Sequence, residues 1–162
     1  MNEKGEIIIY QNEDNGVKID VRLENESVWL TQKQLAEMFD TTKQNIGQHV
    51  KNILDDEELD RNSVVKFFFT TANDGKNYNT EHYNLDMIIS LGYRINSKVA
   101  TKFRQWATAR LKEYIIKGFT MDDERLKSAG GGYWYELLER IRDIRSSEKV
   151  MYRQVLDLYV AA

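Results

Sequence analysis

Apolar and polar residues change their spacing several times along the 162-residue chain, and each change predicts a new element. Near the N-terminus, Val17–Leu23 alternates apolar and charged residues, which predicts a strand with one buried face. The β-prone run Glu6–Gln11 precedes it, and the turn-forming residues Asn12–Gly16 between the two predict a hairpin. Val28–Leu30 either continues this sheet or packs against the next helix.

Two helical patterns follow, joined by a short turn. Gln32–Phe39 carries apolar residues on one face, and Asp40–Thr42 then supplies residues that favour turns and helix caps. The second pattern has a predicted buried face of Ile46, Val50, Ile53 and Leu54. Its predicted exposed face comprises Lys43, Gln44, Gln48 and Lys51. This order predicts a helix-turn-helix whose second helix enters a major groove, and an ordinary αα-hairpin inside a core is the alternative. The exposed amides favour the first, because glutamine can bond an adenine edge while lysine serves guanine or phosphate.

A second hairpin is predicted directly after these helices. Val64–Thr71 is strongly β-prone, Asn73–Lys76 contains an Asp-Gly turn signal, and Tyr78–Tyr83 forms the return strand. This is the order of a winged helix-turn-helix, in which Lys76 and Asn77 lie near the wing tip and reach phosphate or the minor groove. A plain sheet hairpin is the alternative.

Helical patterns occupy residues 84–118. A short helix is predicted over Leu85–Leu91, with Asn84 as its N-cap and Gly92 at its end. A longer helix is predicted over Lys98–Ile116, after a Ser97 cap and before Gly118. Its apolar stripe is Val99, Phe103, Trp106, Ala107, Leu111, Tyr114 and Ile115. The opposite face is Lys98, Lys102, Gln105 and Lys112. These cations either contact phosphates or form a solvated helix face.

The C-terminal part begins with a short helix over Met121–Lys127 and a glycine hinge at Gly130–Gly132. Beyond the hinge, a heptad seam is formed by Trp134, Leu137, Ile141, Ile144, Met151, Val155 and Leu158. Glu148 is the one polar residue at a seam position. The seam predicts a dimer, with a fold-back of the helix over the hinge as the alternative. Residues 1–129 are thus predicted to form the first domain and residues 133–162 a C-terminal amphipathic dimerisation helix.

Composition limits the class of protein. Hydrophobic residues make up 41% and aromatic residues 11%, enough for a packed core. The net charge of −3 and the pI of about 5.5 argue against a general nucleic-acid coat protein, although residues 94–117 are strongly basic. Cysteine is absent, no apolar run is long enough for a bilayer, and the N-terminus lacks a signal-peptide layout. These features predict a cytoplasmic protein without a membrane partner.

Catalytic chemistry finds little support in the residues. His49 and His82 do not have metal-ligand spacing, and the chain contains no P-loop, GxGxxG or GxSxG pattern. His82–Tyr83 at a strand end is better explained as structural than as an acid-base pair. The chain is therefore predicted not to be an enzyme, and neither a cofactor nor a metal is expected.

Several stretches together resemble the RhuM-like family of bacterial proteins, which are described as virulence-associated by origin. They include WLTQKQLAEMF, TTKQNIGQHVKNIL, DDERLK and above all LGYRINSKVATKFRQWAT. The resemblance runs from Glu6 to Tyr159. It implies an N-terminal DNA-binding-type module, an origin among accessory genes of phages and genomic islands, and family members that continue beyond this chain's end, so the chain is expected to be shortened. It places Thr42, Lys43, Gln44, Asn45 and Gln48 at recognition-helix positions.

The sequence as a whole predicts an α+β protein. A winged helix-turn-helix-like domain with small antiparallel hairpins is followed by a helical region and the C-terminal helix. We expect it to be a dimeric, sequence-selective binder of double-stranded DNA that regulates transcription or a mobile element. The predicted DNA contacts are Thr31, Thr42, Lys43, Gln44, Asn45, Gln48, Lys51, Lys76, Asn77, Lys98 and Lys102. The alternatives are an interaction scaffold and the regulatory half of a larger effector or toxin-type system.

Overall fold

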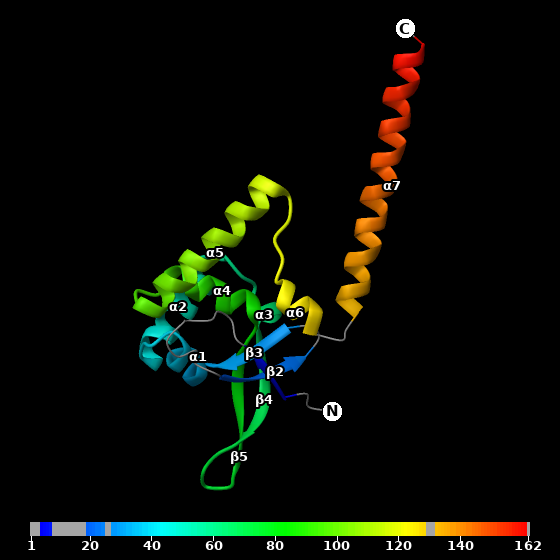
Figure 1. The fold of residues 1–162 in the computed structure, drawn as a ribbon. Helices are drawn as coiled ribbons and strands as arrows, with labels where there is room; N and C mark the ends of the chain where they lie inside the picture. The colour runs from blue at the N-terminus through cyan, green and yellow to red at the C-terminus, as the bar shows by residue number, and fades with distance from the viewer. Residues whose placement is uncertain (1–3, 8–18, 25–26, 129–131, 162) are drawn as a thin grey trace. The chain divides into compact units, whose positions relative to one another are not determined.

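The computed structural model describes residues 4–7, 19–24, 27–128 and 132–161, and its chain divides into two compact units (Figure 1). The first unit is Met1–Glu113 and the second is Tyr114–Ala162. The described residues are mostly helical and include an antiparallel sheet. The prediction of a mixed α and β fold is thus confirmed.

The sheet lies in the first unit. Its strands are β1 (Lys4–Ile7), β2 (Ile19–Glu24), β3 (Ser27–Thr31), β4 (Val65–Thr71) and β5 (Asn77–Tyr83). They are ordered β1-β2-β3-β5-β4, and every neighbouring pair is antiparallel. Pairing of β1 with β2 confirms the N-terminal hairpin, whose predicted turn Asn12–Gly16 lies outside the described residues. Both predicted hairpins therefore belong to one sheet, with β4 at its edge.

The described residues of the first unit also form five helices, the last of which runs across the unit boundary. They are α1 (Gln32–Met38), α2 (Lys43–Asp55), α3 (Arg61–Val64), α4 (Leu85–Arg94) and α5 (Lys98–Lys117). The core joins β3 and β5 to these helices, and its fully buried side chains include Leu30, Leu35, Ile46, Ile53, Met87, Ile88, Leu91 and Ile95. The predicted buried face of α2 is confirmed, with Leu54 partly buried at its margin. The single-turn helix α3 was not predicted from the sequence.

The predicted end of α4 at Gly92 is wrong. The helix continues to Arg94, and Gly92 is buried within it. A Cβ atom added to Gly92 would lie 2.3 Å from Cε1 of Phe103, a buried residue of α5. Glycine is needed here because α4 and α5 approach closely, so it acts through packing and not as a helix terminator.

The predicted apolar stripe of α5 is only partly buried. Ala100 and Phe103 are the buried residues of this helix, and Ala100 was not assigned to the stripe. Leu111, Tyr114 and Ile115 are each more than half exposed. The Ser97 cap is confirmed by a 3.0 Å bond from the Ala100 backbone N–H to its Oγ.

A polar network closes one side of the core beside β5. The Tyr83 hydroxyl donates to Oε2 of Glu81 at 3.0 Å, and Arg61 donates to Oε1 of the same carboxylate at 2.6 Å. Burial, and then the bond to Glu81, raises the pKa of Tyr83 to about 12. The unfolded phenol has a pKa of about 10, so the folded state holds its proton more tightly.

We expect this linkage to destabilise the fold at alkaline pH. The contribution of Tyr83 is present below about pH 10 and is lost as pH rises through about 12, because the unfolded state releases the proton first. The difference in tyrosinate absorbance between the intact protein and Tyr83→Phe isolates this group among the nine tyrosines. A difference curve centred near pH 10 would contradict the expectation. Glu81→Gln keeps the burial and should shift the midpoint down only partly.

In the part that the structure describes, the second unit contains the end of α5 and two further helices, α6 (Asp123–Ser128) and α7 (Gly132–Val160). Gly130 and Gly131 of the predicted hinge lie outside the described residues, and Gly132 begins α7. Within the part of the chain that the structure describes, no helix combines the length and the apolar character needed to cross a membrane.

Candidate nucleic-acid interface

Helix caps fix the start of α1 and the turn between α1 and α2. Thr31 accepts a bond from the Gln34 backbone N–H while the Gln34 side chain accepts from the Thr31 N–H, which forms a capping box at the start of α1. Asp40 has a φ of 51°, the left-handed conformation that aspartate tolerates at a turn. Thr42 caps α2 by accepting from the Asn45 N–H at 3.1 Å, and the Asn45 amide donates to Thr41 Oγ1 at 2.9 Å. Three predicted DNA contacts, Thr31, Thr42 and Asn45, thus also position the helices.

One contact fixes the first turn of α2 against α1. The Gln32 amide nitrogen donates to the Lys43 carbonyl oxygen at 2.6 Å. Gly47 leaves room for it, because a Cβ there would lie 2.7 Å from the same nitrogen. Neither Gln32 nor Gly47 was predicted from the sequence to have this role. Their long-range contact has no signature in local spacing.

The exposed face of α2 is the one that the sequence predicts. Lys43, Gln44, Gln48 and Lys51 are all exposed. The Gln48 amide donates to Oδ1 of Asn52 at 3.1 Å, one helical turn away, which orients its side chain. The Gln44 side chain makes no bond within the described residues, so its donor and acceptor groups are available to a ligand. The exposed face of α2 thus presents two cations and two amides on a helix that is held at its first turn.

The tip of hairpin β4–β5 carries the second predicted set. Lys76 is exposed, and Asn77 accepts a bond from Thr71 Oγ1 at 2.8 Å. Asp74 accepts from the Tyr78 hydroxyl at 2.7 Å and from the Lys76 backbone N–H at 2.9 Å, and these bonds lower the pKa of Asp74. A carboxylate therefore stays ionised beside Lys76. Figure 1 shows this tip at the far end of the strands, away from α2, so the two sets do not form one patch.

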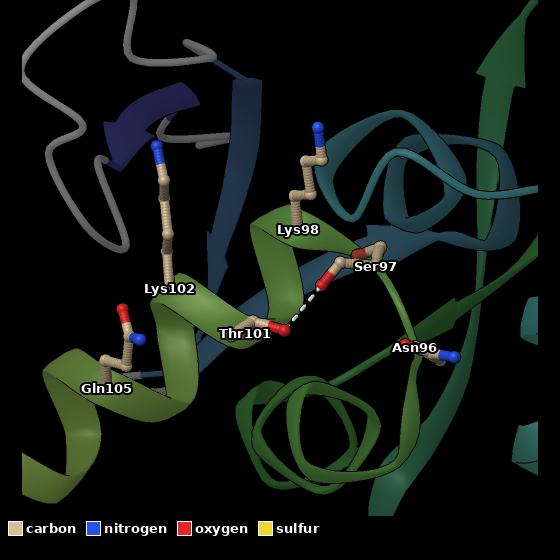
Figure 2. Close-up of a pocket in the computed structure, with 6 residues that line it drawn as sticks. All are labelled: Asn96, Ser97, Lys98, Thr101, Lys102 and Gln105. Atoms are coloured by element: carbon tan, nitrogen blue, oxygen red, sulfur yellow. Dashed lines mark hydrogen bonds between the residues drawn. The ribbon is translucent and has the colours of Figure 1, made fainter.

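The third set lies at the start of α5, where an open depression of about 520 Å³ is lined by Asn96, Ser97, Lys98, Thr101, Lys102 and Gln105. Figure 2 shows Lys98 and Lys102 extending from the same side of the helix. Thr101 is turned to its own backbone, because its hydroxyl donates to the Ser97 carbonyl at 3.0 Å. Both predicted lysines are exposed, and Lys112 is exposed farther along the helix.

The arginines of the basic stretch 94–117 have structural partners. Arg94 bonds to Glu58 at 2.6 Å and to Asp56 at 3.4 Å, and the bond to Glu58 raises the pKa of Arg94. Arg104 donates to the carbonyls of Gly92 and Ile95 at 2.9 and 2.8 Å, which satisfies backbone groups at the end of α4. These side chains join α4 to the acidic loop and to α5. Lys98 and Lys102, which are exposed, are the predicted phosphate contacts of this stretch.

The two histidines have different surroundings. His82 is buried, with Nδ1 2.9 Å from the Thr80 carbonyl oxygen and its ring 4.9 Å from that of Phe68. His49 is half-buried on α2. Among the described residues, no group of histidine, aspartate and glutamate is arranged to hold a metal ion.

The predicted dimerisation seam lies on α7. The structure places this seam on a single uninterrupted helix. Leu137 is half-buried, and the other predicted seam residues are 42 to 74% exposed: Trp134, Ile141, Ile144, Met151, Val155 and Leu158. Within the described part of the second unit, most of the seam is therefore accessible to a partner helix.

Comparison with known proteins gives one family. Residues 63–162 match the family described as the Virulence protein RhuM family. The match begins in α3 and includes β4, β5 and α4 to α7, whereas α1 and α2 precede it. No curated protein and no solved structure matches the chain. Because the matched residues are more than half of its length, the chain belongs to the Virulence protein RhuM family.

Proposed function

We propose that this protein binds double-stranded DNA with sequence selectivity, using α1 and α2 as a helix-turn-helix and hairpin β4–β5 as its wing. The observation that carries the proposal is the exposed face of α2. Lys43, Gln44 and Gln48 project from the N-terminal half of a helix whose first turn is held by Gln32 and capped by Thr42. Recognition helices contact base edges with residues placed in this way.

In this proposal, four other lysines contact the phosphate backbone of the DNA. Lys51 continues the α2 face, Lys76 at the wing tip reaches a neighbouring phosphate, and Lys98 and Lys102 bind phosphates from the start of α5. With a net charge of −3, the protein as a whole does not favour non-selective binding to nucleic acid. Local placement of lysines therefore matters more than overall charge.

The functional unit is a dimer joined through α7. A symmetric pair buries the seam and brings two recognition helices into one assembly. Successive major-groove faces of a palindromic site lie about 34–36 Å apart, which is the spacing that the two helices of the proposed dimer have to meet. In this arrangement the protein regulates transcription or a mobile element. Selection of bound duplexes from a random pool tests the proposal, with two enriched half-sites as the expected result.

Removing the α2 amides is expected to relax sequence preference. Gln44→Ala should cost about 1–3 kcal/mol of binding free energy at one base position, because the glutamine edge contact is lost. Titration of the selected duplex and of its single-base variants measures this. Gln154→Ala removes an exposed amide from α7 and is the matched control. Unchanged affinity and preference in the Gln44→Ala, Gln48→Ala double variant would exclude α2 as the reading helix.

The exposed apolar seam of α7 also favours a second candidate, an interaction scaffold in which α1 and α2 are purely structural. Salt dependence separates the two functions. DNA binding through lysines releases counterions, so affinity for duplex should fall steeply between low and physiological salt. A scaffold of pI about 5.5 should show no affinity for duplex at either salt concentration.

A further inference from the structure

The outer edge of β4 is an open sheet edge with two exposed phenylalanines. Within the described residues, β4 pairs with β5 on one side and with no strand on the other. Phe67 is 55% and Phe69 is 72% exposed, and Figure 1 shows the hairpin extending beyond the helices of its unit. Proteins usually protect such edges with charge, proline or a bulge. Residues 65–71 contain no proline and a single charge, Lys66, so this strand is suited to pairing with another.

The backbone groups on the open edge belong to the odd-numbered residues of β4. The Asn84 N–H donates to the Val64 carbonyl at 3.0 Å, and the Ala72 N–H donates to the Lys76 carbonyl at 2.9 Å. Every second pair of an antiparallel ladder is hydrogen-bonded, so even-numbered residues between these points bond to β5. The N–H and C=O groups of residues 65, 67, 69 and 71 therefore point to the open edge.

The three central side chains of β4 are phenylalanines and read the same in both directions about Phe68, whereas the flanking positions differ. A reversed copy centred there sets Phe67 opposite Phe69 of the partner subunit, and Lys66 opposite Thr70 of the partner subunit. Odd-numbered residues then face odd-numbered residues, so outward N–H groups meet outward C=O groups. Aromatic side chains pair across the strands and no like charges meet, both of which stabilise a sheet.

We propose that β4 pairs antiparallel with β4 of a second copy of this chain, across a two-fold axis at Phe68. The contact joins two sheets edge to edge and covers the two exposed phenylalanines. Because the same strand serves on both sides, the pairing closes on itself and leaves no open β4 edge. It goes beyond the DNA-binding proposal, does not rest on it, and is separate from the α7 seam.

The test uses the full chain carrying Ile141→Glu and Val155→Glu, which remove the α7 seam so that association reports on β4. At tens of micromolar, loss of the α7 seam should leave this parent protein monomeric. At concentrations well above that, sedimentation velocity should show a concentration-dependent dimer formed through β4. Phe67 and Phe69 are then replaced together, by two lysines, by two glutamates, or by Phe67→Lys with Phe69→Glu. Both positions are exposed, so the fold should be retained, and circular dichroism checks this.

The proposed register ranks these variants. In the double-lysine variant lysines face lysines, and the protein should be monomeric. In the lysine–glutamate variant opposite charges face each other twice. This variant should therefore associate at least about tenfold more tightly than the double-lysine variant. Mixing the double-lysine and double-glutamate variants should restore dimers. Equal association of the lysine–glutamate and double-lysine variants would overturn the register.

If the parent protein stays monomeric at high concentration, β4 does not pair with a second copy of this chain. This result overturns the proposal even if the β4 edge binds an extended segment of another protein. Amide exchange in the parent gives an independent measurement. The amides of Phe67 and Phe69 should become protected as concentration rises, and constant exchange would contradict the proposal. The effect of Gln44→Ala on DNA recognition is measured in a separate experiment. The DNA-binding proposal and the β4 pairing can therefore fail independently of each other.

Discussion

Replacing Gly92 by alanine is expected to lower the free energy of unfolding by about 2 kcal/mol. The added Cβ would lie 2.3–2.4 Å from two ring atoms of Phe103. The ring is itself buried and in edge or tilted contact with Phe39, Tyr93 and Trp106, so it has little room to move. Overpacking of this kind costs about 1–3 kcal/mol or more, against a gain of up to about 1 kcal/mol from the better helix former. Urea denaturation of both proteins measures the difference.

A second substitution identifies the cause of this loss. In a Phe103→Leu background the ring is absent, so Gly92→Ala should become neutral or stabilising by up to about 1 kcal/mol. Gly47→Ala is the matched control, because its Cβ meets the end of the flexible Gln32 side chain. If Gly92→Ala costs the same with and without Phe103, close packing of α4 on α5 does not explain the glycine.

Elements whose signals are local were predictable from the sequence. Thr42, Asn84 and Ser97 each cap the helix that their position predicts, since a cap needs only a short side chain and the next three residues. Gly118 ends α5 with a φ of 78°, and Gly75 makes the hairpin turn with a φ of 77°. These residues satisfy nearby backbone groups or adopt a backbone angle that disfavours other residues.

Features that depend on distant contacts were not predictable. Gly92 carries the same local signal as a helix terminator, and only the approach of Phe103 reveals its packing role. In the sequence, Arg104 is one of several cations on a predicted helix. Only the structure shows that it bonds to the Gly92 and Ile95 carbonyls at the end of α4. The exposure of Leu111 likewise shows that periodicity marks an apolar face without identifying what covers it.

Some features of the candidate DNA site could likewise be predicted from the sequence, and others could not. The exposure of Lys43, Gln44 and Gln48 follows from helical periodicity and was predicted. Two other features could be seen only in the folded chain. The Asn45 side chain bonds to Thr41, and Lys76 lies beside an ionised Asp74. Specificity is therefore expected to depend most on Gln44, whose side chain has no bond within the described residues.

Breaking the α7 seam is expected to convert a dimer into a monomer. In a symmetric pair, Ile141 and Val155 of both copies are buried, and each side chain contributes roughly 1.5–3 kcal/mol through burial. Ile141→Glu with Val155→Glu should therefore raise the dissociation constant by at least about a thousandfold. Light scattering at tens of micromolar measures the mass. Glu148→Leu, which makes the remaining seam position apolar, should tighten the dimer.

The control for this experiment lies on the same helix. Val150 and Leu156 are 53 and 46% exposed, close to the 50 and 53% of Ile141 and Val155, but they occupy positions outside the heptad seam. Val150→Glu with Leu156→Glu makes the same chemical change with the same added charge. Because a coiled-coil seam depends on heptad position and not on exposed apolar area, this control should remain dimeric. Equal loss of association in both pairs would contradict the seam, and a monomeric mass for the unsubstituted chain would exclude the dimer.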